Sequence, residues 1–92
     1  MKVLVVVDQH RDVVGVATSL DAAAQMARDD FECVAKENDM DAQTCSMLIF
    51  QDEKRYFEGD MKKCHQIIFP HPTEDYDAAW YYAYPCEVRE EC

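Results

Sequence analysis

The chain has 92 residues, of which 19 are acidic and nine are basic, so its formal net charge is −10 and its sequence pI is about 4.5. Apolar and aromatic residues make up 49% of it, which excludes an acidic disordered tail and predicts a single compact domain, residues 1–92. Such a negative charge argues against independent binding to DNA or to an anionic membrane and favours a partner with a basic surface.

The first third of the chain predicts a β-hairpin that leads into a helix. Lys2–Val7 and Val13–Ala17 are rich in valine, which is typical of strands, and the short polar stretch between them predicts a turn. Thr18 and Ser19 supply an N-cap for a helix over about 19–37. Apolar residues recur there at three- and four-residue steps, and many are alanines, so the helix can lie close to a sheet.

The rest of the chain predicts further strands and a second, shorter helix. Apolar runs predict strands in Cys45–Gln51 and Cys64–Phe69, with a turn at 52–54 and a returning strand at 55–58 between them. Two prolines end the last strand, and a capped, aromatic-rich helix is expected over about 74–84. This order predicts an α+β fold in which one main helix and a short C-terminal helix lie against a small antiparallel sheet.

Cysteine and histidine gather in the second half of the chain, but their spacing does not predict a metal site. The residues concerned are Cys64, His65, His71, Cys86 and Cys92. No spacing among them matches the paired-ligand signatures of structural zinc sites. Cys64 and His65 are neighbours on a predicted strand, so their side chains point to opposite faces and cannot form a catalytic dyad. The chain also lacks a glycine-flanked serine and a glycine-rich phosphate loop. We therefore expect no metal, no cofactor and no enzymatic activity.

Dense acidic patches and a run of aromatic residues are the features that predict binding. The acidic residues are Asp29, Asp30, Glu32, Asp39, Asp41, Asp52 and Glu53. An acidic coat keeps many small proteins soluble, but an excess of ten charges goes beyond that need and favours mimicry of a nucleic-acid backbone. Tyr81 and Tyr82 are either core residues or anchors of a protein interface, and the sequence leaves both readings open.

The opening of the chain resembles a known class of small phage proteins. Residues 14–23 read VGVATSLDAA and follow the valine-rich residues 2–7, so a hairpin enters a capped helix. In this opening, its length and its acidity, the chain resembles the anti-CRISPR proteins of the type I-F group, which bind the multisubunit CRISPR RNA-guided surveillance complex. The resemblance implies a stoichiometric inhibitor that acts in the cytoplasm of an infected bacterial host and prevents target DNA from pairing with the guide RNA.

The same resemblance accommodates the two basic doublets of the chain, which would meet the guide RNA at the edge of an acidic interface. These residues are Lys54, Arg55, Lys62 and Lys63. Two other functions remain open at this point. One is a small acidic phage or plasmid regulator, similar to an antitoxin, that binds a basic nucleic-acid-binding protein. The other is a metal-binding accessory domain.

Overall fold

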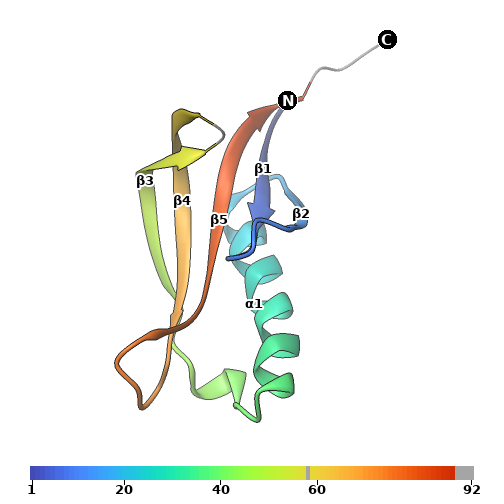
Figure 1. The fold of residues 1–92 in the computed structure, drawn as a ribbon. Coiled ribbons are helices and arrows are strands. Elements are labelled where there is room, and N and C mark those ends of the chain that lie inside the picture. The colour runs from blue at the N-terminus through green and yellow to red at the C-terminus, as the bar shows by residue number, and fades with distance from the viewer. Residues whose placement is uncertain (58, 89–92) are drawn as a thin grey trace.

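A five-stranded antiparallel sheet with one long helix against one face forms the fold of the computed structural model (Figure 1). The structure describes residues 1–57 and 59–88, and for residues 55–57, 60 and 62 it describes the backbone alone. The elements are β1 (Lys2–Val7), β2 (Val13–Ala17), α1 (Leu20–Glu37), the 3-10 turn η1 (Ala42–Thr44), β3 (Leu48–Phe57), β4 (Asp60–Pro70) and β5 (Asp77–Glu87). The strand order across the sheet is β2-β1-β5-β4-β3. This confirms an α+β fold with a small antiparallel sheet and one main helix.

Helix α1 begins and ends where local side chains satisfy its free backbone groups. The Ser19 hydroxyl accepts a hydrogen bond from the backbone amide of Ala22 at 3.1 Å, which confirms the predicted N-cap. At the other end the Asn38 side-chain amide donates to the carbonyl oxygen of Val34 at 2.8 Å. Between these residues the helix buries mainly alanines against the sheet. Gly15 of β2 extends this close approach, because a Cβ atom there would lie 2.5 Å from the Met26 sulfur.

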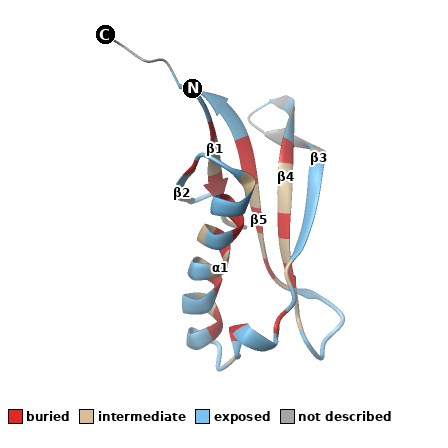
Figure 2. Cartoon of the chain, turned by 180° about the vertical axis from the view of Figure 1, so that it is seen from behind, coloured by how far each residue is buried: buried red, intermediate tan, exposed pale blue. Residues whose placement is uncertain are grey.

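The core lies between α1 and the facing side of the sheet, where Figure 2 shows the buried residues. Phe31 of α1 stacks on Phe69 of β4 with ring centroids 4.4 Å apart, and Tyr81 of β5 meets Phe69 edge-on at 5.8 Å. The guanidinium of Arg28 lies 5.9 Å from the centre of the Phe69 ring. All three aromatic rings are at most 1% exposed, so this cluster fixes the position of the helix on β4 and β5.

The predicted C-terminal helix over about 74–84 is wrong, because most of that segment belongs to strand β5. This strand pairs with both β1 and β4 and occupies the centre of the sheet. Its residues alternate in burial: Ala79, Tyr81 and Ala83 are buried under α1, and Trp80 and Tyr82 between them are only half-buried. Alternation at period two is the signature of a strand. The expected helix cap forms a loop instead, in which the His71 Nδ1 atom accepts from two backbone amides.

The predicted turn at 52–54 is also absent, because β3 runs through it as one strand from Leu48 to Phe57. Pairing with β4 shifts register between Phe50 and Glu53, and Asp52 adopts a positive φ of 56°. Aspartate tolerates that left-handed conformation better than most residues, so the polar stretch makes a bulge instead of a turn. The chain reverses near Gly59, whose φ is 89°.

Candidate functional site

The charges of the chain are divided unevenly between its parts. Residues 48–70, which contain β3 and β4, include four acidic and four basic residues and carry no net charge. The remainder includes fifteen acidic and five basic residues and therefore carries the whole net charge of −10. Residues 29–41, here called the acidic segment, contain six acidic residues and one lysine, so they hold half of that excess.

The acidic segment covers the second half of α1 and the connector that leads to η1. Asp29, Glu32, Asp39 and Asp41 are exposed and Asp30 is half-buried. Asp29 accepts a hydrogen bond from the Gln25 side chain at 2.9 Å, and Asp41 caps η1 by accepting from the Gln43 amide at 2.9 Å. None of these five carboxylates forms an ion pair with a lysine or arginine in the part of the chain that the structure describes. Their charge is therefore left for solvent or a partner to neutralise.

Asp52 and Glu53 lie apart from the acidic segment, on the edge strand β3. The pairing of β3 with β4 places Lys54 opposite Lys63 and Arg55 opposite Lys62 along the backbone. The structure thus brings together the four basic positions that the sequence singled out, here called the basic hairpin, and sets Asp52 and Glu53 directly before them. Lys54 and Lys63 are exposed, and the side chains of Arg55 and Lys62 lie outside the described part.

The acidic segment and the basic hairpin lie toward opposite ends of an elongated molecule of 48 × 27 × 19 Å (Figure 1). The end that holds η1 also carries the β4–β5 loop, in which Glu74 and Asp75 are exposed, and the exposed Asp77 at the start of β5. The Debye length at physiological salt is about 8 Å, far shorter than the molecule. The two regions therefore act on a partner as separate charges and do not neutralise one another.

The structure separates the two tyrosines that the sequence treated together. Tyr81 is 1% exposed, so it belongs to the core and is not a surface anchor. Its hydroxyl donates to the Asp30 carboxylate at 2.7 Å, across 51 residues of sequence. Tyr82 is half-buried on the sheet face that α1 does not cover, and its role as an interface residue stays a prediction. Sequence reasoning missed the Tyr81–Asp30 contact, because no local pattern links strand β5 to the middle of α1.

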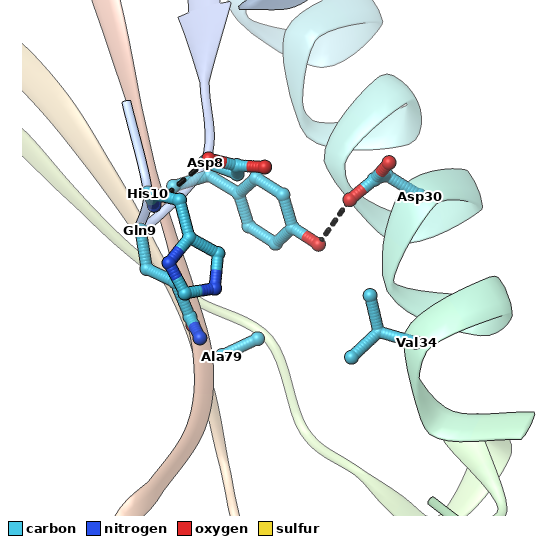
Figure 3. A pocket seen from close by; sticks show the side chains of 7 residues that line it. Asp8, Gln9, His10, Asp30, Val34 and Ala79 are labelled. Carbon is cyan, nitrogen blue, oxygen red and sulfur yellow. Dashed lines mark hydrogen bonds between the residues drawn. The ribbon is translucent and has the colours of Figure 1, made fainter. Parts of the chain in front are cut away.

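The Tyr81–Asp30 pair borders a small cavity of about 70 Å³ between the β1–β2 turn, α1 and β5 (Figure 3). Its lining residues are Asp8, Gln9, His10, Asp30, Val34, Ala79 and Tyr81. One oxygen of Asp8 accepts from the backbone amides of His10 and Asp12 at 2.8 and 3.0 Å, which fixes that carboxylate at the turn. The side-chain oxygen of Gln9 is buried and has no hydrogen-bond partner among the residues that the structure describes.

The Tyr81 hydroxyl keeps its proton in this cavity. Burial, and then the hydrogen bond to Asp30, raise the pKa of the Tyr81 hydroxyl above its ordinary value. A tyrosine that acts as a base or nucleophile at neutral pH needs the opposite shift. The Tyr81 hydroxyl donates its proton to Asp30, and the carboxylates of Asp30 and Asp8 act as hydrogen-bond acceptors. The cavity is therefore suited to bind a group that carries several hydrogen-bond donors.

A larger hollow of about 390 Å³ continues from the cavity along the C-terminal half of α1. The two share Gln9 and Val34, and the larger one extends to His71 and Tyr76 of the β4–β5 loop. Its floor includes the buried ring of Phe31. Together they form a groove with a mixed polar and apolar lining that ends in an acidic cavity.

Comparison of the chain with models of known protein families, with curated proteins and with solved structures finds no match. Within residues 1–57 and 59–88, no three cysteine, histidine or acidic side chains come together as ligands for a metal ion. No helix in that part is both long enough and apolar enough to cross a bilayer.

Proposed function

We propose that this chain is a stoichiometric inhibitor that binds the type I-F CRISPR RNA-guided surveillance complex and prevents target DNA from pairing with the guide RNA. Its place of action is the cytoplasm of an infected bacterium. The observation that carries the proposal is the division of charge between an acidic segment without internal ion pairs and a basic hairpin far from it. The surveillance complex presents basic protein surfaces that the acidic segment can bind and a guide RNA that the basic hairpin can bind.

The acidic segment is suited to occupy a surface that normally grips nucleic acid. Asp29, Glu32 and Glu37 are exposed on α1 over about 12 Å at 1.5 Å per residue, a length over which one DNA strand presents three or four phosphates. Lysines and arginines that bind phosphates would meet these carboxylates instead. The helix holds these charges in place, so little ordering is needed when the partner binds.

The basic hairpin supplies the second contact of this proposal. Lys54 and Lys63 are exposed and opposite one another in the β3–β4 pairing, so they repel each other in the free protein. An RNA backbone would relieve that repulsion. The contact is an addition to the acidic interface and not an independent RNA-binding activity, since residues 48–70 carry no net charge.

A gel-shift competition tests the proposal. Purified type I-F surveillance complex is incubated with the protein and then offered labelled target DNA. We expect the DNA shift to disappear while the protein comigrates with the complex, and the inhibition to weaken as salt rises from 50 to 300 mM. Comigration with an unchanged DNA shift would overturn the blocking step. Absence of comigration would overturn the choice of partner and leave a different basic protein to be identified by pull-down.

Matched charge variants test whether the partner binds the acidic segment in particular or responds to the net charge of the whole surface. Glu32→Gln with Asp39→Asn removes two charges from it, and Asp12→Asn with Asp21→Asn removes two exposed charges elsewhere. We expect the first pair to weaken inhibition at least tenfold and the second pair to change it less than twofold. Equal losses in the two pairs would mean that overall charge, and not this surface, attracts the partner.

A further inference from the structure

We propose that the cavity beside Tyr81 is a receptor for an arginine side chain supplied by the partner protein. The inference rests on the proposed function only in requiring a partner with a basic surface. It names the group that enters and the residues that hold it: the carboxylates of Asp8 and Asp30, with Gln9 beside them in the wall of the cavity.

The hydrogen-bonding inventory of the cavity points to a ligand with several donors. A carboxylate can accept about four hydrogen bonds. The bonds shown at Asp30 and Asp8 are one from Tyr81 and two from backbone amides, respectively. The buried Gln9 oxygen accepts none from the described part of the chain. A guanidinium group presents five N–H donors in one plane and carries the positive charge that two carboxylates attract. A lysine ammonium has three donors on a single atom and fits separated acceptors less well.

The acceptors are held in position by the fold and not by loop side chains alone. Tyr81 is fixed at the centre of the sheet, and its 2.7 Å hydrogen bond orients the Asp30 carboxylate from the opposite wall. The turn amides fix Asp8 in the same way. A buried acceptor without a donor, as at Gln9, is rare in folded proteins and calls for an explanation. A donor group in the cavity supplies one when the Gln9 side chain turns toward it.

Size and shape favour entry of a side chain from the adjoining groove. The cavity volume of about 70 Å³ equals roughly two water molecules at 30 Å³ each, which suits a planar head group better than a whole ligand. Val34 and Ala79 offer apolar walls for the methylene stem. The larger hollow beyond Val34, lined also by Tyr76, leaves room for the partner backbone that carries the arginine.

A titration of the full-length protein with two peptides tests this inference without the surveillance complex. The probes are acetyl-Ala-Arg-Ala-amide and the same peptide with citrulline, which keeps the shape of arginine but lacks its charge. We expect the arginine peptide to shift the NMR signals of the Gln9 side-chain amide and of the backbone around Asp30 and Tyr81. The citrulline peptide should bind at least tenfold more weakly. Equal binding of the two peptides, or no shift at these residues, would overturn the proposal.

Two neighbouring helix residues provide a matched pair of variants. Asp30→Asn removes one charge from the cavity but keeps an oxygen that accepts from Tyr81, whereas Asp29→Asn removes one charge from the exposed face. We expect Asp30→Asn to weaken the arginine peptide at least fivefold and Asp29→Asn to leave it within twofold. Equal weakening would show general attraction to an acidic surface. If Asp30→Asn fails to fold, the peptide comparison on the unaltered protein still decides.

The outcomes distinguish this inference from the proposed function. Peptide binding at the cavity together with no association with the surveillance complex would keep the arginine receptor and reject the partner. Inhibition of the complex without peptide binding at the cavity would reject the arginine receptor and keep the proposed partner.

Discussion

Replacing Tyr81 by phenylalanine tests whether the bond to Asp30 stabilises the fold. The substitution keeps the ring that packs edge-on against Phe69 and removes only the hydroxyl that donates at 2.7 Å. A hydrogen bond to a charged group contributes about 1.5–3 kcal/mol to stability. Asp30 is half-buried and borders a cavity that water can enter, so its carboxylate can be rehydrated after the change. We therefore expect a loss at the lower end, about 1.5 kcal/mol.

That loss is large enough to measure in a domain of this size. A chain of 92 residues is expected to unfold with a free energy of about 5–14 kcal/mol. A change of 1.5 kcal/mol corresponds to a fall in Tm of about 6–12 °C. Urea unfolding followed by the fluorescence of Trp80 gives the free energy directly. Tyr76→Phe is the matched control, because Tyr76 is 61% exposed, and its effect should stay within about 0.5 kcal/mol.

A double-mutant cycle with Asp30→Ala decides whether the effect belongs to the pair. If the hydroxyl acts through Asp30, adding Tyr81→Phe to Asp30→Ala should cost at least about 1 kcal/mol less than adding it to the unaltered protein. Additive losses, or a Tyr81→Phe variant as stable as the parent, would refute the reasoning. Packing alone would then account for the position of Tyr81.

Three further changes test the fold. Ser19→Ala should destabilise the protein by about 1 kcal/mol in urea unfolding, because it removes the N-cap bond of α1, while Thr18→Ala should have a smaller effect. Phe31→Ala should cost about 3–5 kcal/mol by the same measurement, since it leaves a cavity against the Phe69 ring; a loss below 1 kcal/mol would contradict the stacked core. The pKa of Tyr81 is raised in the folded protein, so above about pH 10 this hydroxyl ionises only in the unfolded chain. The free energy of unfolding should therefore fall as pH rises above about 10. Tyr81→Phe should make that fall less steep, and an identical slope would argue against the raised pKa.

The first third of the chain could be predicted because its signals are local. The valine-rich runs at Lys2–Val7 and Val13–Ala17 favour strands through their own composition, and Ser19 caps the helix that follows it directly. The apolar stripe of α1 repeats every three or four residues, so the helix and its buried face follow from spacing. None of these features needs contacts with distant parts of the chain.

The helix predicted over about 74–84 is wrong because the contacts that decide the structure of this segment are not local. Alanines favour helices and aromatic residues favour strands, so its composition fits both. The structure pairs it with β1, some 80 residues earlier, and with β4. Those two ladders satisfy its backbone on both sides, and this tertiary pairing overrides the local preference for a helix.

The features of the candidate site also differ in whether the sequence alone could predict them. The acidic segment could be predicted, because six acidic residues within 29–41 are visible in the sequence and a surface helix exposes them. The cavity could not, since Asp8, Asp30 and Tyr81 come from three separate elements that only the folded sheet brings together. The basic hairpin could be predicted only in part. Its two basic doublets are visible in the sequence, but their pairing across β3 and β4 depends on the register set after the bulge at Asp52.

Strand β5 connects all the features to which we assign binding. It pairs with β1, which leads into the turn that holds Asp8, and with β4, which carries Lys63 of the basic hairpin. From its centre Tyr81 reaches across the core to Asp30 on α1. The acidic segment, the cavity and the hairpin are thus attached to one hydrogen-bonded framework. Because a surface fixed before the encounter loses little conformational entropy on binding, its unpaired charges can contribute to affinity without a large ordering cost.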